Sequence, residues 1–337
     1  MLFRSRIEAV DYYLPNQQLT NEDLSLKFPE WSVDKIGSKT GIMSRRIAAV
    51  DEFSSDLAVA AARNLFTNHN IDAASVEYLI VCTQSPDFFL PSTATIVQNQ
   101  LGLRTGIGAV DVNLGCSGYI YALGLAKGLI ESDQVSNVLV ITADTYSKFL
   151  NPQDKSVRTI FGDGSAATLV GGHGGPSSIY AVTYGSDGAG AKSLLVPNGG
   201  LREGNGLSPM AAVEVRGIES NGFDLFMDGP AIFNFTLKVV PELVGNVLQR
   251  GDLKMEEVDL FVLHQANGFM LEHLRKKLGI DFEKFFVSLA QSGNTVSSTI
   301  PIALTEAVRQ GRLQPGMKVM MLGFGVGLSW AGLMVDW

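Results

Sequence analysis

Short apolar runs alternate with amphipathic segments along most of this chain. Residues 76–82, 137–144 and 258–264 are apolar and rich in β-branched side chains, which predicts buried strands. Residues 119–130 instead repeat apolar side chains at the spacing of a helix. Strands that alternate with helices form mainly parallel sheets with helices on their faces. We therefore expect an α/β fold built from layers of sheet and helix.

Several helices are expected to begin at recognisable capping residues. Thr20 with Asp23 three positions later is close to a capping box, and the Ser-Ser-Asp sequence at 54–56 precedes another amphipathic segment. Residues 91–92, Pro-Ser, open a further helix. Pro230 suits the first turn of a long apolar helix, where its missing N–H costs no hydrogen bond.

The second half of the sequence repeats the pattern of the first. The strand at 258–264 matches the strand at 76–82, and an amphipathic helix and an acidic turn precede each of them. Each strand is followed at a similar distance by a Gly-containing turn, which holds Cys116 in the first half and Asn294 in the second. The pattern predicts an internal duplication in which these two residues occupy equivalent places.

The Gly-rich stretch at 171–176 is the strongest break in the chain, and we expect the boundary between the two halves there. The expected N-terminal half spans residues 1–174 and carries the cysteine. The C-terminal half spans residues 175–337 and carries the histidine and asparagine discussed below. Residues 185–222 are rich in Gly, Asn and Ser and are expected to form surface loops or a small flap.

Composition narrows the class of protein. The chain has 337 residues, of which 46% are hydrophobic and 18% charged, so a large globular core is expected rather than disorder. A formal net charge of −8 argues against nucleic acid as a partner. Two cysteines rule out a disulfide framework and suit a reducing cytoplasm. The first residues do not resemble a signal peptide, and no apolar run is long enough for a membrane span.

Cys116 is the first candidate for chemistry. It lies between a predicted strand at 105–112 and a predicted helix, with Gly115 and Gly118 allowing a sharp turn beside the sulfur. A thiol at a helix N-terminus feels the positive end of the helix dipole, which favours the nucleophilic thiolate. The alternative is that Cys116 is simply a small buried apolar residue.

His264 and Asn294 are the partners that the duplication places beside Cys116. Ligands of α/β sheets bind at the carboxyl ends of strands, and Cys116 and His264 both follow a predicted strand at that end. Asn294 enters from the turn that matches the Cys116 turn. Taken singly, His264 is explained as a satisfied core residue and Asn294 as a helix cap. Their placement beside a candidate thiolate favours a shared catalytic site.

Two further motifs have ordinary explanations. The basic stretch at 31–47 is either a solvated face or a phosphate contact. The Gly-Asp-Gly sequence at 162–164 lacks the Gly-Lys-Ser/Thr ending of a phosphate loop, so we expect it to let two backbones pass closely. Cys82 ends a predicted strand and is expected to be a core residue.

Four motifs in order resemble one enzyme family. They are Gly-Cys-Ser-Gly around Cys116, His-Gln-Ala-Asn at 264–267, Ser-Gly-Asn-Thr at 292–295 and Gly-Phe-Gly-Val-Gly-Leu-Ser-Trp at 323–330. Together the motifs resemble β-ketoacyl-acyl-carrier-protein synthase III of the thiolase superfamily. The resemblance covers nearly the whole chain. It implies the five-layer αβαβα thiolase fold, a homodimer and a Cys-His-Asn triad.

The chemistry implied by the resemblance has two halves. Cys116 accepts an acyl group from acyl-CoA, while the backbone N–H groups of Cys116 and Val326 hold the oxyanion. His264 Nε2 and the Asn294 amide then donate to the carbonyl of a malonyl thioester on acyl carrier protein. Loss of CO₂ leaves a carbanion that attacks the acyl-cysteine and gives a β-ketoacyl product. No metal or bound redox cofactor is implied, since CoA and phosphopantetheine thioesters are the substrates. The implied role is the start of fatty acid biosynthesis or a specialised relative in secondary metabolism.

The resemblance also implies substrate contacts, and the chain departs from the family pattern at some of them. The implied contacts are Trp31, Leu90, Asn267, Phe269 and Gly325. In the family, Trp31 helps to hold the CoA adenine, and Leu90 reaches the acyl pocket across the dimer. Phe269 stands where the family often has an Arg that meets the carrier protein, and Val326 interrupts a glycine run. These departures leave the identity of the acyl donor and of the acceptor undetermined by the resemblance.

Three other functions fit parts of the sequence. Papain-like proteases share the order Cys, His, Asn, but their cysteine has different flanks and lies near the mature N-terminus. An acyltransferase that moves the acyl group to oxygen or nitrogen without decarboxylation would be better served by a base at Asn294. A non-catalytic scaffold is the third alternative, and the intact Cys116, His264 and Asn294 argue against it.

Overall fold

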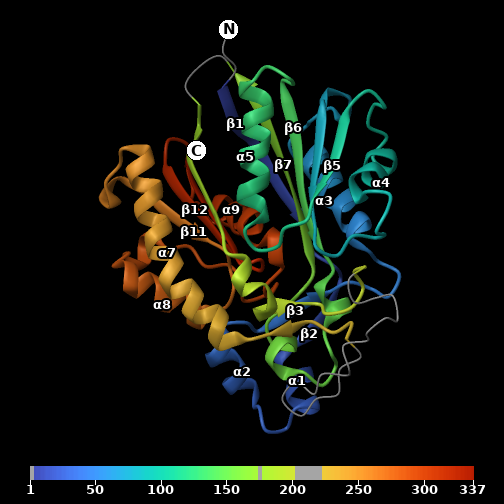
Figure 1. Ribbon diagram of the computed structural model, residues 1–337, viewed down its shortest axis with the longest axis vertical. Coiled ribbons are helices and arrows are strands. Elements are labelled where there is room, and N and C mark those ends of the chain that lie inside the picture. Colours follow the sequence, from blue (N-terminus) through green and yellow to red (C-terminus); the bar gives the residue numbers. More distant parts are fainter. Residues whose placement is uncertain (1–3, 174–176, 202–221) are drawn as a thin grey trace.

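The computed structural model describes residues 4–173, 177–201 and 222–337, which form two sheets with helices between and outside them (Figure 1). Two of the predicted features fall partly outside these residues. They are the Gly-rich break at 171–176, of which 174–176 are not described, and the loop at 185–222, of which 202–221 are not described.

The first sheet is built from the N-terminal half. Its strands run in the order β1-β7-β6-β4-β5. β4 is parallel to β5 and β6, whereas β7 is antiparallel to both of its neighbours, β1 and β6. The strands are β1 (Arg4–Tyr13), β4 (Tyr78–Cys82), β5 (Gly108–Val112), β6 (Asn137–Asp144) and β7 (Gly164–His173).

The second sheet is built from the C-terminal half, in the order β11-β12-β13-β8. β11 and β12 are parallel, and the other two pairs are antiparallel. The expectation of mainly parallel sheets is therefore only partly right. β12 and β13 are joined by a short turn, and a turn of that length permits only antiparallel pairing. The strands are β8 (Ile179–Ser186), β11 (Leu260–Leu263), β12 (Lys318–Gly325) and β13 (Ser329–Asp336).

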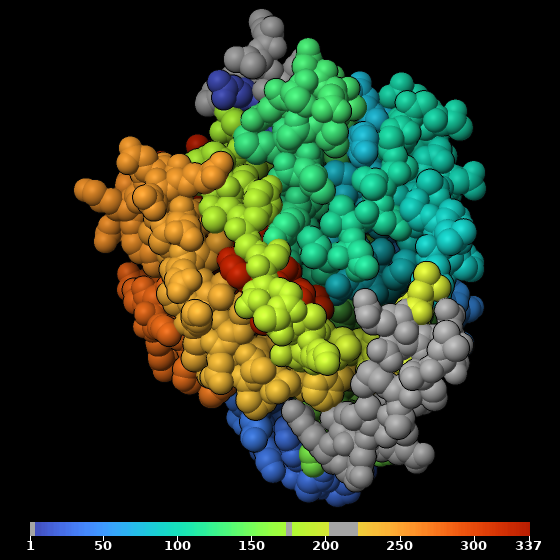
Figure 2. Space-filling model, in the orientation of Figure 1, coloured from blue at the N-terminus to red at the C-terminus, as the bar shows by residue number. Residues whose placement is uncertain are grey.

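Helices complete five layers. α5 (Gly118–Glu131) and α9 (Thr299–Arg309) lie between the two sheets and contact both. α3 (Ser54–Asn68) and α4 (Thr93–Gln100) cover the outer face of the first sheet. α7 (Gly229–Gly251) packs on the outer face of the second sheet, and α8 (Gly268–Leu278) shares its core. Figure 2 shows residues 177–201, in yellow-green, crossing the front of the molecule between α5 and α7.

The central layer carries the main core. Ile120 and Leu123 of α5 and Ile300 and Leu304 of α9 are fully buried with apolar strand residues of both sheets, including Val140. This burial follows from the helical spacing of apolar side chains that the sequence shows. The central helices therefore fix the two sheets relative to each other.

Smaller elements surround the lower end of the sheets. Among the described residues, two short strand pairs stand apart from the main sheets, β2 with β3 and β9 with β10. The bounds are β2 (Gln17–Thr20), β3 (Ser44–Ile47), β9 (Leu194–Leu195), β10 (Phe226–Met227), α1 (Asn21–Lys27), α2 (Val33–Thr40) and α6 (Lys155–Arg158), with 3₁₀ turns at Ala73–Ser75, Tyr146–Phe149, Gly188–Ser193, Met255–Glu257, Phe282–Lys284 and Val296–Ser298.

The predicted helix caps are partly right. Thr20 and Asp23 form a full capping box at α1, and Ser92 is the N-cap of α4. The N-cap of α3, however, is Phe53, one residue before the predicted Ser-Ser-Asp cap. Asp56 explains the shift, because its side chain accepts the backbone N–H of Phe53 at 2.9 Å.

Among the described residues, one helix, α7, has the length and apolar composition that could cross a bilayer. Val240, Leu243 and Val247 on one face are buried against the second sheet. Its apolar composition is thus accounted for by a core helix, and Pro230 lies in its first turn as predicted.

The division into halves at residues 1–174 and 175–337 stays a proposal. In its support, the strands of the first sheet all precede residue 174 and those of the second all follow residue 175. The Gly-rich break is not wholly a linker, since β7 continues through Gly171 and Gly172. In the second half, the counterpart of β5 is reduced to an isolated parallel bridge between Phe261 and Phe285.

Gly118 provides a test of the packing between β4 and α5. A Cβ at Gly118 would lie 2.3 Å from Cys82 Sγ, so Gly118→Ala should lower the free energy of unfolding by about 1–3 kcal/mol. Cys82→Ala in the same chain should recover part of this loss because it removes the sulfur. Denaturant unfolding measures both.

Gly128 of the same helix is the matched control. Nothing lies within 4 Å of a Cβ at this position, so Gly128→Ala should leave stability unchanged or raise it by about 0.5–1 kcal/mol. Equal losses for the two substitutions would mean that the contact with Cys82 is not what requires glycine at 118.

Candidate active site

Cys116 lies in the turn between β5 and α5, and β12 passes directly beside it. A Cβ at Gly325 would come within 2.8 Å of Cys116 Sγ, and one at Gly323 within 2.8 Å of the Cys116 carbonyl oxygen. Gly115 is similarly confined, since a Cβ there would lie 2.4 Å from Gln84 Oε1. Gly325 therefore leaves the space that the sulfur occupies, and Gly323 and Gly115 allow close packing around the Cys116 turn.

The electrostatic setting of the thiol differs from the expectation. Burial, together with the charge of Asp144, raises the pKa of Cys116 to about 12. Hydrogen bonds from the backbone N–H groups of Val326 and of Cys116 itself act to lower that pKa, but they do not outweigh burial. Burial thus favours the thiol over the thiolate predicted from the helix dipole, because desolvation of the charged form dominates.

His264 follows β11 and is almost fully buried. Its backbone N–H donates to the Leu322 carbonyl oxygen of β12 at 2.8 Å. This bond extends the pairing of β11 with β12 and fixes His264 at the end of the strand. The ring meets Phe324 edge-on, with centroids 5.7 Å apart. Burial lowers the pKa of His264 to about 3, so the imidazole is neutral at working pH.

Thr299 is the hydrogen-bond partner of Nδ1 on this imidazole. Its Oγ1 lies 2.7 Å from His264 Nδ1 and 3.2 Å from the Val296 carbonyl oxygen. The hydroxyl has one proton, which it donates either to Nδ1 or to the Val296 oxygen. A hydroxyl that donates to Nδ1 leaves the proton of the neutral ring on Nε2, where it is available as a donor.

Asn294 is held by its backbone and by its own side-chain oxygen. Its N–H donates to Ile160 O at 2.9 Å and its carbonyl accepts from Gly162 N at 3.0 Å. Its Oδ1 accepts from Val296 N at 2.9 Å. The amide oxygen is therefore occupied, and Nδ2 is the part of the side chain left to donate.

Asn267 repeats this arrangement. It is the N-cap of α8, and its Oδ1 accepts from Met270 N at 2.9 Å. Its amide nitrogen is again the part of the side chain left to donate.

The close passage of two backbones that was predicted at 162–164 is also confirmed, because a Cβ at Gly162 would lie 2.3 Å from Ser292 O beside the Asn294 turn.

These side chains share one cavity of about 140 Å³. Cys116, His264, Asn294, Asn267 and Gly325 all line it. Its remaining wall is mostly apolar and comes from the Phe161 region, the β9–β10 pair, α7, α8 and β12. The other lining residues are Ile160, Phe161, Leu194, Met227, Gly229, Ile232, Phe233, Thr236, Ala266, Met270 and Phe324.

Three of the predicted substrate contacts do not line this cavity. Trp31 lies with the ammonium groups of Lys35, Lys39 and Lys155 between 5.2 and 5.8 Å from its ring. Leu90 is 82% exposed, and Phe269 is 54% exposed. Phe269 instead stacks on the cavity residue Phe233, with centroids 5.7 Å apart, and therefore lies next to the cavity wall.

Two residues near the site were not predicted. Thr299 was missed because a serine or threonine at the start of a helix normally reads as a cap. Asp144 gave a clearer signal, since it is a charged residue that ends an apolar strand at the edge where Cys116 and His264 lie.

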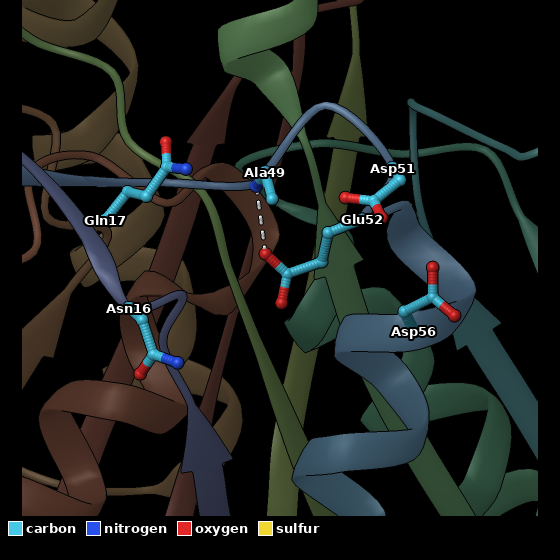
Figure 3. A pocket seen from close by; sticks show the side chains of 6 residues that line it. All are labelled: Asn16, Gln17, Ala49, Asp51, Glu52 and Asp56. Carbon is cyan, nitrogen blue, oxygen red and sulfur yellow. Dashed lines mark hydrogen bonds between the residues drawn. The ribbon is translucent and has the colours of Figure 1, made fainter.

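A second hollow, about 430 Å³, lies beside the start of α3 and has a different character (Figure 3). Its carboxylates are used locally: Glu52 accepts from Ala49 N and Tyr13 Oη, and Asp56 accepts from Phe53 N. None of its lining residues is a nucleophile with a base beside it. They are Asn16, Gln17, Ala49, Asp51, Glu52 and Asp56.

Comparison with known proteins gives consistent similarities. Residues 110–188 match the family described as 3-oxoacyl-[acyl-carrier-protein (ACP)] synthase III, and residues 248–337 match its C-terminal part. A β-ketoacyl-[acyl-carrier-protein] synthase III of Caldanaerobacter subterraneus subsp. tengcongensis is 38% identical over 96% of this chain and 95% of its own.

Solved structures agree with this similarity. A 3-oxoacyl-(acyl-carrier-protein) synthase III at 2.1 Å has a TM-score of 0.96 and 46% identity, covering 99% of this chain and 100% of its own. The priming β-ketosynthase of the R1128 polyketide biosynthetic pathway has a TM-score of 0.86 and 30% identity, covering 98% and 96%. The five-layer thiolase-like α/β fold predicted from the sequence is thereby confirmed.

Gly325 offers a direct test of access to the sulfur. Gly325→Ala places a methyl group against Cys116 Sγ and should slow alkylation of Cys116 by iodoacetamide about tenfold, an increase of about 1.4 kcal/mol in the barrier. Intact-protein mass spectrometry follows the reaction.

Gly229→Ala is the control, because Gly229 lines the same cavity but has nothing within 4 Å of a Cβ. It should react at the rate of the unmodified chain. If Gly325→Ala reacted equally fast, β12 would not limit the space at the sulfur.

Proposed function

The chain belongs to the 3-oxoacyl-[acyl-carrier-protein] synthase III family, and from this premise we propose that it condenses an acyl group from acyl-CoA with malonyl-acyl carrier protein. The reaction releases CO₂ and CoA and gives a β-ketoacyl product, as in the first condensation of fatty acid biosynthesis. The chain is thus an acyltransferase of the condensing type. The observation that carries this proposal is that Cys116, His264 and Asn294 line one cavity, where Asn294 Nδ2 and His264 Nε2 have no hydrogen bond to any described residue.

In the first half-reaction, the sulfur of Cys116 attacks the thioester carbonyl of acyl-CoA. The carbon–sulfur bond to CoA breaks, and the thiol proton leaves with the CoA sulfur. The backbone N–H groups of Cys116 and Val326 both interact with the sulfur, which supports their proposed role at the developing oxyanion. Gly325 supplies the room that the acyl group needs beside the sulfur.

In the second half-reaction, His264 Nε2 and Asn294 Nδ2 donate to the carbonyl oxygen of the malonyl thioester. Loss of CO₂ leaves the electron pair on the α-carbon, with negative charge on that oxygen, and two neutral donors stabilise it. The pKa of His264, lowered by burial, suits this role because the ring stays neutral and keeps one donor proton. The carbanion attacks the acyl-cysteine, and the thiolate of Cys116 leaves.

The substrates reach the cavity from the surface between α2, α7 and α8 in this proposal. Trp31 and its three lysines offer an aromatic face and positive charge, which suit the adenine and phosphates of CoA. Asn267 presents its amide to the pantetheine arm. Phe269, beside Phe233, takes the place of the arginine that other members use toward the carrier protein.

We propose a homodimer through the free edge of β5. β5 is the last strand of the first sheet and pairs only with β4 among the described residues, while Val110 at its centre is 39% exposed. Phe88, Phe89 and Leu90 lie exposed in the loop before α4, which packs on β5. A second copy would cover this apolar surface and carry Leu90 toward the acyl group of its neighbour.

We propose that the reaction uses neither a metal nor a redox cofactor. Both half-reactions move electron pairs between carbon, oxygen and sulfur without net oxidation, and decarboxylation supplies the carbanion. A cytoplasmic location is proposed because Cys82 and Cys116 are both free thiols, which suits a reducing compartment.

Acyl transfer to oxygen or nitrogen without decarboxylation is the alternative, and the site does not favour it. Such a reaction needs a base for the acceptor. Asn294 does not titrate, and the low pKa of His264 makes it a weak base. Release of labelled CO₂ from malonyl-acyl carrier protein separates the two functions.

The proposed roles of Cys116 and Asn294 are tested by measuring the two half-reactions separately. Cys116→Ala should abolish acyl-enzyme formation across a panel of acyl-CoAs, measured by intact-protein mass spectrometry. Asn294→Ala should retain acylation but lower condensation at least about a hundredfold, the usual cost of one lost oxyanion donor. Acyl-enzyme in Cys116→Ala, or equal losses of both steps in Asn294→Ala, would contradict these roles.

The dimer proposal is tested at the centre of the free edge. Val110→Lys should shift the chain from dimer to monomer in sedimentation velocity, because it places a charge in the proposed interface. Val50→Lys, at a position that is 93% exposed elsewhere on the surface, should sediment as the unmodified chain does. A monomeric unmodified chain, or a Val110→Lys variant that stays dimeric, would exclude this interface.

A further inference from the structure

Asp144 is a fully buried carboxylate next to the catalytic groups. It is the last residue of β6, and one of its oxygens accepts from the Gln84 backbone N–H at 2.8 Å. Its other oxygen accepts the Ser297 hydroxyl and the Ser297 backbone N–H, the latter at 3.3 Å. Asp144 therefore ties the first sheet to the segment that follows Asn294.

That segment has an unfavourable backbone. Val296 has a φ of +56°, a left-handed conformation that is rare for a β-branched residue. Such conformations cost about 1–3 kcal/mol and persist only where the surroundings hold them. The Val296 N–H is the group that fixes Asn294 Oδ1, so the orientation of the Asn294 amide depends on this strained turn. The bonds from Ser297 to Asp144 hold the turn at its far end.

Asp144 also acts on the nucleophile. After burial, its charge is the main influence that raises the pKa of Cys116. Burial raises the pKa of Asp144 itself to about 7, so it is mostly ionised at pH 8. The other titratable groups that interact with it are Cys82, Tyr146 and Asp163.

We infer that Asp144 is a positioning residue with two separable effects: through Ser297 it holds the turn that presents the Asn294 amide, and its buried negative charge makes the Cys116 sulfur less reactive. The first effect rests on the proposed function, because it concerns the condensation step. The second does not, because it concerns the reactivity of the sulfur alone.

Asp144→Asn tests both effects with a side chain of nearly the same shape. Iodoacetamide at pH 8 should alkylate Cys116 about tenfold faster, since loss of a nearby like charge lowers the pKa of the thiol and raises the fraction of thiolate. Condensation of the acyl-enzyme should fall at least about tenfold, whereas acylation from acyl-CoA should not fall, because the sulfur itself becomes more reactive. Ser297→Ala should reproduce the loss of condensation but leave the alkylation rate unchanged, because it keeps the charge.

Glu131→Gln is the matched control. Glu131 accepts the N–H and hydroxyl of Ser5 in the same way, but at the far end of α5 from Cys116. Glu131→Gln should leave the rates of alkylation, acylation and condensation unchanged. Thermal unfolding of each variant separates a local change from loss of the fold.

The outcomes distinguish the inference from the proposed function. If Asp144→Asn leaves alkylation unchanged, the charge effect is wrong. If Ser297→Ala lowers acylation and condensation equally, or neither, the turn is not what Asp144 holds. If Asp144→Asn does not fold, Ser297→Ala still decides the first effect. Failure of the proposed function would appear in the unmodified chain, as absence of CO₂ release, and would leave the alkylation result valid.

Discussion

The site depends on a backbone contact in which β12 runs against the Cys116 turn with no side chain between them. Side chains at Gly323 or Gly325 would collide with Cys116 or its neighbour Ser117. This contact brings the Val326 N–H to a sulfur that belongs to the other half of the chain. It also sets the depth of the sulfur, and that depth explains why burial rather than the helix dipole governs its charge.

The same edge of the two sheets collects the other functional groups. β11 ends at His264 and the Cys116 turn follows β5, so strand ends that are distant in the sequence converge on one cavity. This convergence could be predicted, because strand ends and the duplicated turns are visible in the apolar pattern. The five layers are implied by the motifs that resemble a known family and are confirmed, whereas the two halves and the catalytic triad stay predictions.

Other features could not be predicted because they arise from contacts between distant segments. Thr299 bonds to the imidazole Nδ1 of His264, and only the packed turn creates this contact. The antiparallel pairing of β13 and β8 joins strands far apart in the chain, and no local periodicity encodes it. The raised pKa of Cys116 depends on burial and on Asp144, both properties of the folded molecule.

Two features beside the cavity lower the stability of the fold but fix the geometry of the site. The N–H that occupies Asn294 Oδ1, and so leaves Nδ2 as the donor of the amide, belongs to the strained Val296. A relaxed turn would free that oxygen, and the amide would then present an acceptor as readily as a donor to an enolate oxygen. The buried charge of Asp144 and the left-handed Val296 are thus two costs of one arrangement, an amide and a neutral imidazole that offer only hydrogens to a developing negative charge.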